Sequence, residues 1–390
     1  MCLKDTLVEI SNNVMFRLSL CSRELFHSNF WAWLIEKQPI QVLPIFVKDL
    51  DLSKIDLSNF DVKREETVSK VMQKNIYTGK EINKKCNADI SFKLGDTLYI
   101  IENKFKSLPD SEQLNNYIEG KSNTKIILTS FIKPYFELKP NMSFVSYETI
   151  LLGLQNVDLT VFEEDEKSII KNYIECLRLL VELKKELSFT KNSTLTYGEF
   201  IKQMESVKEI AEKNNFYYFI EKIFYSNLLG DILSDLNNKD VYGGVYFVNK
   251  AKYPYMDMML SLHHRDYDNI SKFRNDISNN TNYKVFTLGV QITNKEYRKY
   301  FNVIKKKPQK TDDLKQEITK DVLNNYEDFI GEREECRSKY NNGFWCYDSE
   351  NDMWFFSKTK IDITRMNFKQ LKEQINKDID YLIKNKKNFL

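Results

Sequence analysis

The alternation of apolar and polar positions along this chain is clearest around two neighbouring runs. Residues 87–94 and 97–104 are rich in apolar side chains, and the short polar step Gly95-Asp96 separates them. A step of this kind suits a tight turn. The pattern therefore predicts two strands joined as a hairpin.

A helix is expected directly after the hairpin. Pro109 is followed by an N-cap candidate at Asp110 or Ser111. Gln113 and Tyr117 lie four residues apart, so they share one face of this helix. Both side chains can then face the end of the second strand.

The rest of the first half mixes helical and strand patterns. Apolar spacings of three and four residues, with the polar positions between them, predict helices at 3–18, 22–37, 147–154 and 165–185. Strands are expected at 60–72, 125–131 and 142–146. A right-handed crossover would set the strand at 125–131 parallel to the one at 97–104. We therefore expect an α/β fold in which helices flank a mixed sheet.

The second half of the chain differs from the first in its pattern of residues. Residues 188–193 are polar and show no periodic spacing of apolar side chains, so we expect a domain boundary there and two domains, 1–190 and 191–390. The second is predicted to be an α+β domain that selects the substrate or a partner. Two aromatic runs, 344–347 and 353–356, predict a hairpin whose side chains either pack in the core or stack on nucleic-acid bases.

Three charged residues sit at the ends of the two central strands. Side chains on a strand alternate between faces, so Glu102 and Lys104 point the same way while Asn103 points the other way. Asp89 on the preceding strand adds a second acid. Burying these charges is costly unless they are paired, and a divalent cation resolves the conflict.

The expected cation is Mg²⁺ or Mn²⁺. Mg²⁺ prefers oxygen ligands, which here are the carboxylates of Asp89 and Glu102 and the backbone carbonyl of Asn103. Such an ion acidifies water and stabilises charge on a phosphate. Lys104 would orient the water or neutralise the developing charge, and Gln113 with Tyr117 would support the site.

These motifs resemble the core of the PD-(D/E)XK nuclease superfamily, which has the restriction-endonuclease-like fold. The resemblance rests on A-D-I ending at Ile90, on I-E-N-K ending at Lys104, and on Gln113 with Tyr117 in the next helix. It is closest to the branch with an E-N-K triplet and a Q-x-x-x-Y helix. The resemblance covers residues 20–150 and implies that Asp89 and Glu102 bind the metal while Lys104 assists the attacking water.

The resemblance also implies two further carboxylates. Glu24 is a candidate metal ligand and catalytic residue, although an acid in a first helical turn can simply complement the helix dipole. In the strand at 60–72, Glu65 or Glu66 can face the site, and similarity to family members favours Glu65. The alternative is that both belong to a solvated strand surface.

Composition limits the class of protein without naming its substrate. The chain has 390 residues, a net charge of +2 and 13% aromatic residues, so it carries no strongly basic surface of the kind that marks a dedicated DNA-binding domain. The six cysteines show no zinc-like spacing, and neither a signal peptide nor a membrane span is evident. We expect a cytoplasmic protein whose partner is nucleic acid, DNA rather than RNA, with a homodimer or a protein partner also open.

The resemblance implies a metal-dependent nuclease, and members of this kind are frequent in bacterial defence against foreign DNA. Two alternatives stay open from the residues alone. One is a catalytically silent module that binds nucleic acid or a protein, and the other is a ribonuclease that uses the same site.

Overall fold

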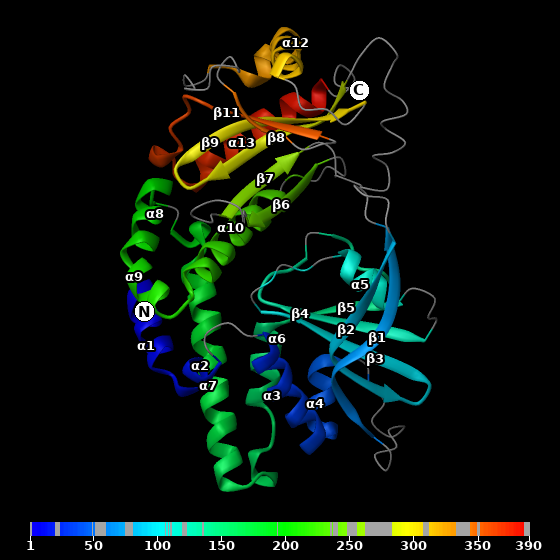
Figure 1. The fold of residues 1–390 in the computed structure, drawn as a ribbon. Helices are drawn as coiled ribbons and strands as arrows, with labels where there is room; N and C mark the ends of the chain where they lie inside the picture. The colour runs from blue at the N-terminus through cyan, green and yellow to red at the C-terminus, as the bar shows by residue number, and fades with distance from the viewer. Residues whose placement is uncertain are drawn as a thin grey trace. The chain divides into compact units, whose positions relative to one another are not determined.

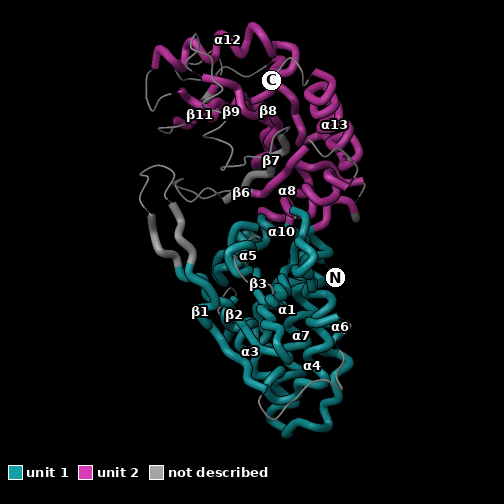
Figure 2. The backbone as a smooth tube through the Cα atoms, turned by 90° about the vertical axis from the view of Figure 1, so that its right-hand side faces the viewer, with its two compact units in different colours: residues 1–187, 207–223 teal, residues 188–206, 224–390 magenta. Residues whose placement is uncertain are grey.

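The computed structural model contains two compact units (Figures 1 and 2). Unit 1 contains residues 1–187 and 207–223, and unit 2 contains residues 188–206 and 224–390. The residues that the structure describes are 2–19, 24–48, 50, 60–74, 81–105, 107, 109, 111–118, 123–134, 136–192, 194–234, 236, 241–247, 256–261, 283–306, 312–332, 344–348 and 352–385. The assignment of separate roles to residues 1–190 and 191–390 stays a prediction.

The first unit contains one sheet and the helices around it. Its strands are β1 (Val62–Lys74), β2 (Glu81–Leu94), β3 (Thr97–Lys104), β4 (Thr124–Ser130) and β5 (Met142–Ser146). Its helices are α1 (Leu3–Asn12), α2 (Val14–Leu18), α3 (Glu24–Lys37), α4 (Pro39–Phe46), α5 (Ser111–Ile118), α6 (Tyr147–Gln155), η3 (Leu159–Val161), α7 (Glu164–Glu186), α9 (Lys208–Lys213) and the start of α10 (Tyr217–Leu233).

The sheet of unit 1 is mixed, with strand order β1-β2-β3-β4-β5. The pairs β1–β2 and β2–β3 are antiparallel, whereas β3–β4 and β4–β5 are parallel. The parallel pairing of β3 with β4 agrees with a crossover through α5. The predicted mixed sheet flanked by helices is therefore confirmed.

Helices contact this sheet on both of its faces. On one face, α5 packs its buried residues Leu114 and Tyr117 against apolar side chains of β2, β3 and β4. On the other face, α3 contacts β1, β2 and β3, and α6 contacts β5. Every residue of β3 from Ile100 to Lys104 is buried, as expected for a strand covered on both sides.

One predicted helix is interrupted. The pattern at 3–18 forms α1 and α2, because Asn13 leaves the helical backbone between them. The side chain of Asn13 accepts a hydrogen bond from the Phe16 N–H, at 3.1 Å, and so caps α2. A capping interaction of this type ends one helix and starts the next.

The second unit is built on an antiparallel sheet with strand order β10-β11-β9-β8-β7-β6. Its strands are β6 (Tyr242–Phe247), β7 (Met256–Ser261), β8 (Tyr283–Thr293), β9 (Glu296–Lys305), β10 (Trp345–Asp348) and β11 (Asp352–Lys358). Its helical segments are η4 (Phe189–Asn192), α8 (Tyr197–Ser206), the end of α10, α12 (Asp312–Ile330), η5 (Ile363–Arg365) and α13 (Phe368–Lys384). The predicted combination of helices and strands is confirmed.

The two faces of the aromatic hairpin β10–β11 differ. Phe355 is fully buried and stacks on Phe301 of β9, with 4.6 Å between ring centroids. Trp354 and Phe356 lie half-buried on the opposite face, where Tyr300 packs between them at 5.6 and 5.9 Å. Phe355 therefore belongs to the core of unit 2, whereas Trp354 and Phe356 do so only in part.

Among the helices described, none combines the length and apolar character needed to cross a lipid bilayer. Cys2, Cys86, Cys176 and Cys346 are free thiols.

The helical glycines of unit 2 provide a test of its packing. A Cβ added at Gly198 of α8 would lie 2.7 Å from the backbone oxygen of Thr364 in η5, whereas a Cβ at Gly230 of α10 would meet nothing within 4 Å. We expect Gly198→Ala to lower the free energy of unfolding by about 1–3 kcal/mol through overpacking. The matched control Gly230→Ala should raise it by up to about 1 kcal/mol, because alanine favours the helix. Urea unfolding followed by circular dichroism measures both, and equal effects of the two substitutions would contradict the close packing of α8 on η5.

Candidate active site

The β2–β3 hairpin brings two acids to adjacent strands. Gly95 in its turn has a φ of +58°, a left-handed conformation that glycine adopts without strain. The paired residues run back to Ile90 opposite Ile101, so Asp89 and Glu102 come next on their strands. Oδ2 of Asp89 accepts a hydrogen bond from the Asn103 N–H at 2.7 Å.

Glu102 is held by three side chains. Its Oε1 lies 2.7 Å from Nζ of Lys104 and accepts a hydrogen bond from Nε2 of Gln113 at 2.8 Å. Its Oε2 accepts a hydrogen bond from the hydroxyl of Tyr117 at 2.7 Å. Glu102 and Lys104 are only 2% and 8% exposed, so this pair is largely removed from water. We refer to Asp89, Glu102 and Lys104 as the charged cluster.

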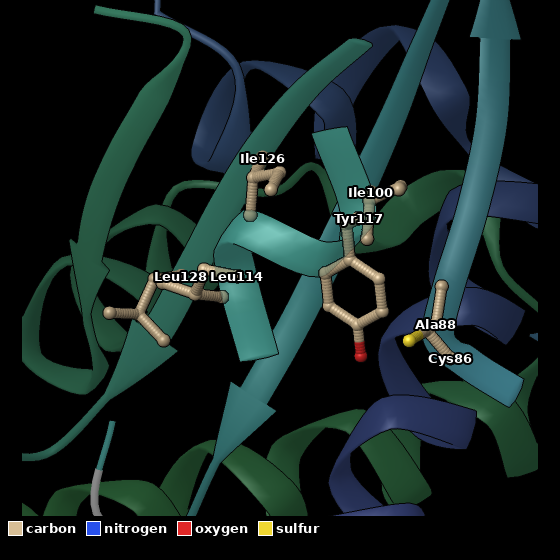
Figure 3. Close-up of a cluster of buried hydrophobic side chains, with 7 residues drawn as sticks. All are labelled: Cys86, Ala88, Ile100, Leu114, Tyr117, Ile126 and Leu128. Carbon is tan, nitrogen blue, oxygen red and sulfur yellow. The ribbon is translucent and has the colours of Figure 1, made fainter. Parts of the chain in front are cut away.

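The helix that supplies Gln113 and Tyr117 is anchored by apolar packing. Figure 3 shows the ring of Tyr117 among the buried side chains of β2, β3, β4 and α5. Its hydroxyl also lies 2.8 Å from the carbonyl of Asn87, two residues before Asp89. Nε2 of Gln113 donates to the Tyr117 hydroxyl at 3.0 Å, which ties the two side chains together.

The carboxylates of the charged cluster resist ionisation. Burial, followed by the charge of Glu102, raises the pKa of Asp89 to about 8, although the Asn103 N–H and Lys104 oppose this shift. Burial also raises the pKa of Glu102, against the opposing effects of Lys104 and Tyr117. Strongly shifted carboxylates beside a specific charge partner are typical of functional sites.

Lys104, unlike the two acids, is stabilised in its charged form. Burial alone would lower its pKa, but the charge of Glu102 and the hydrogen bond to it, with further contributions from Glu24 and Asp89, raise the pKa above its usual value. Its ammonium group therefore stays protonated at neutral pH. Of its three donors, one is used by Glu102.

Glu24 begins α3 on the other side of β3. Its Oε1 accepts hydrogen bonds from the N–H and the hydroxyl of Ser107, at 2.7 and 2.5 Å. Ser107 follows β3 by three residues, so this carboxylate lies close to the end of the strand that carries Lys104. Its negative charge contributes to the raised pKa of Asp89. The structure thus brings Glu24 near the charged cluster.

Glu65 is placed differently. It lies on β1 with a φ of +51°, its side chain is exposed, and no hydrogen bond or ion pair joins it to the described residues of the cluster. The neighbouring Glu66 accepts a hydrogen bond from Ser91 and pairs with Lys63 at 2.9 Å. The structure therefore brings neither acid to the cluster, and Glu65 is not among the residues that we propose to bind the cation.

The cluster fits a divalent cation by the chemistry of its donors. Two carboxylates converge, and each keeps acceptor capacity beyond its hydrogen bonds to described groups: Oδ1 of Asp89 and the second lone pair of Oε2 of Glu102. Within the described part of the chain, however, no group of three or more His, Cys, Asp or Glu side chains is arranged to hold a metal ion. Mg²⁺ commonly binds through one or two carboxylates, with waters and substrate oxygens as its other ligands. A role for the Asn103 carbonyl stays a prediction.

The pattern of the sequence did not reveal several supporting residues. Tyr147 and Thr129 both donate hydrogen bonds to Oδ1 of Asn103, at 2.7 and 3.3 Å. Ser107 holds Glu24, as described above. The two-residue period of the strand predicted only that the Asn103 side chain points away from the face of Glu102 and Lys104.

Comparison with known proteins identifies a family for this chain. A family profile described as the PD-(D/E)XK nuclease superfamily matches residues 13–226, which include every residue of the charged cluster. No curated protein and no solved structure matches the chain. The matched segment covers more than half of the chain, and on this basis the protein belongs to the PD-(D/E)XK nuclease superfamily.

Proposed function

We propose that unit 1 hydrolyses phosphodiester bonds of nucleic acid with a divalent cation, Mg²⁺ or Mn²⁺, and that DNA is the substrate. The observation that carries this proposal is the charged cluster, in which Asp89 of β2 lies beside the last residues of β3, Glu102 and Lys104, where the pairing of the two strands ends. Membership of a nuclease superfamily supports it.

The raised pKa values of the two acids support the metal part of the proposal. Two buried carboxylates repel one another, and each is difficult to ionise near the other. A cation held by Asp89 and Glu102 would remove that repulsion and favour both charged forms. When bound, such a cation acidifies water and offsets the negative charge that develops on the phosphate.

The remaining residues of the site have complementary roles in this proposal. Lys104 donates hydrogen bonds to the attacking water or to a phosphate oxygen with the donors that Glu102 leaves over. Gln113 and Tyr117 hold the Glu102 carboxylate in one orientation. The remaining lone pair of its Oε2 therefore keeps one direction, in which it can bind the cation. Hydrogen bonds of this kind around a ligating carboxylate tune both affinity and geometry.

The choice of DNA over RNA rests on family resemblance. The two substrates differ at the 2′-OH, which a protein reads by direct contacts, and the phosphate chemistry is the same for both. The suggested role in bacterial defence has the same basis. The cleavage assay must therefore include both DNA and RNA.

The first test measures cleavage of duplex DNA, single-stranded DNA and RNA in Mg²⁺, in Mn²⁺ and in EDTA. We expect metal-dependent cleavage of DNA, lost in EDTA. Asp89→Ala and Lys104→Met should each lower kcat by about 10²–10³-fold, because the first removes a ligand of the cation and the second removes a donor to the attacking water or the phosphate. The control Lys93→Met, an exposed lysine on β2, should change kcat by less than about twofold.

Each other outcome of this test is informative. Cleavage that survives both substitutions in the charged cluster would place the chemistry elsewhere. Cleavage of RNA alone would correct the substrate. A wild-type protein that binds nucleic acid without cutting it would favour a silent binding module.

The second test uses stability in the absence of metal. The carboxyl of Asp89 has a pKa of about 8 in the folded protein, above its ordinary value of 3.8. The folded state therefore retains a proton that the unfolded chain has lost, and stability falls as the pH rises from 4 to 8. Asp89→Asn removes this loss and keeps an acceptor for the Asn103 N–H.

We expect Asp89→Asn in EDTA to raise the free energy of unfolding by about 1–2 kcal/mol at pH 8, with a smaller gain at pH 5. Urea unfolding at several pH values measures this difference. The control Asp96→Asn, in the exposed β2–β3 turn, should show no such pH-dependent gain. An Asp89→Asn protein that is less stable than wild type at pH 8 would contradict the strained, ionisation-resistant cluster.

A further inference from the structure

The carboxamide of Asn103 is completely buried and uses its full hydrogen-bonding capacity. The side chain is 0% exposed. Its Nδ2 donates to the carbonyl of Glu24 at 3.0 Å and to the hydroxyl of Ser28 at 3.2 Å. Its Oδ1 accepts from the hydroxyls of Tyr147 and Thr129, at 2.7 and 3.3 Å. These four contacts come from α3, β4 and α6, three elements far apart in the sequence.

The orientation of this carboxamide is determined by its partners. The carbonyl of Glu24 can only accept a hydrogen bond, so the nitrogen must face α3 and the oxygen must face Tyr147. A flipped amide would set two acceptors against each other in a buried place, at the cost of an unsatisfied polar group. Asn103 therefore binds the first residue of α3 in one defined geometry.

The same residue is joined to every charged group of the site. Its neighbours in the chain are Glu102 and Lys104, and its backbone N–H holds the carboxylate of Asp89. Its side chain holds the backbone of Glu24, whose carboxylate lies at the end of β3.

We propose that Asn103 is a positioning residue whose carboxamide sets where Glu24 lies relative to Asp89 and Glu102. The inference rests on the proposed function, because its consequence is the affinity of the site for a divalent cation and the rate of cleavage. The charge of Glu24 already acts on both acids, since it raises their pKa values. A displaced α3 would move this charge and change how well the site holds a cation.

A pair of tyrosines offers a matched test. Tyr147 donates to Asn103, whereas Tyr173 bonds Nδ1 of His27 at 2.8 Å and makes no described contact with Asn103. Both are 0% exposed, and each stacks on a phenylalanine, with centroid distances of 4.0 Å for Tyr147 and 3.9 Å for Tyr173. Tyr147→Phe and Tyr173→Phe therefore each remove one buried hydroxyl from the same aromatic region.

The experiment measures Mn²⁺ binding to the full chain by titration of free Mn²⁺, together with kcat and KM for DNA and the unfolding temperature. We expect both variants to lose similar stability. Tyr147→Phe should also weaken Mn²⁺ binding and lower kcat by about tenfold while KM stays within about twofold, as is typical of residues that orient metal ligands. Tyr173→Phe should leave Mn²⁺ affinity and kcat within about twofold of wild type. Asn103→Leu, which removes all four bonds, should have a larger effect than Tyr147→Phe if it folds.

A double-mutant cycle identifies the route of the effect. If Asn103 acts through Glu24, Tyr147→Phe should have no further effect on Mn²⁺ affinity in a Glu24→Gln background. An equally large effect in that background would overturn the inference. So would equal Mn²⁺ affinities of Tyr147→Phe and Tyr173→Phe in a wild type that binds and cleaves normally, and this result would leave the proposed function intact. A wild type that neither binds Mn²⁺ nor cuts would refute the proposed function and this inference with it.

Discussion

The structure of unit 1 depends on keeping two like-charged side chains together in a place that is poor in water. The carboxylates of Asp89 and Glu102 repel one another, and burial disfavours the ionised form of each. Lys104 attracts both carboxylates, but it supplies one positive charge against two negative ones. Burying a hydrophobic pair in the same place would cost less free energy, and carboxylates shifted in this way are typical of functional sites.

The residues around these buried charges restrain them from both faces of β3. Hydrogen bonds from Gln113, Tyr117 and Lys104 restrain Glu102 on one face of β3. On the opposite face, the Asn103 carboxamide is satisfied by four groups and anchors the start of α3. A strand covered on both sides can use alternate residues for two purposes, because successive side chains point to opposite faces. In β3 one face carries the charged side chains Glu102 and Lys104, and the other carries the Asn103 carboxamide that bonds α3 and α6.

The apolar packing explains how α5 can hold its two polar side chains in place. Leu114 and the ring of Tyr117 are buried against residues of three strands, so the helix is held by hydrophobic contact while the hydroxyl and the amide reach Glu102. Tyrosine suits such a position, since its ring can be buried and its hydroxyl can still find a partner. The positions of the polar groups thus depend on packing around them.

The sequence by itself determined the local parts of the site. A two-residue period put Glu102 and Lys104 on one face, a tight turn at Gly95 put Asp89 on the neighbouring strand, and a four-residue spacing put Gln113 and Tyr117 on one side of a helix. These relations depend on backbone geometry over a few residues, and the structure has them as expected. Only the tertiary structure decided the rest: that Tyr147 bonds Asn103 across 44 positions of sequence, that Ser107 holds Glu24, and that Glu65 stays exposed. Contacts of this kind are set by how helices and strands pack against each other, and no periodicity along the chain encodes them.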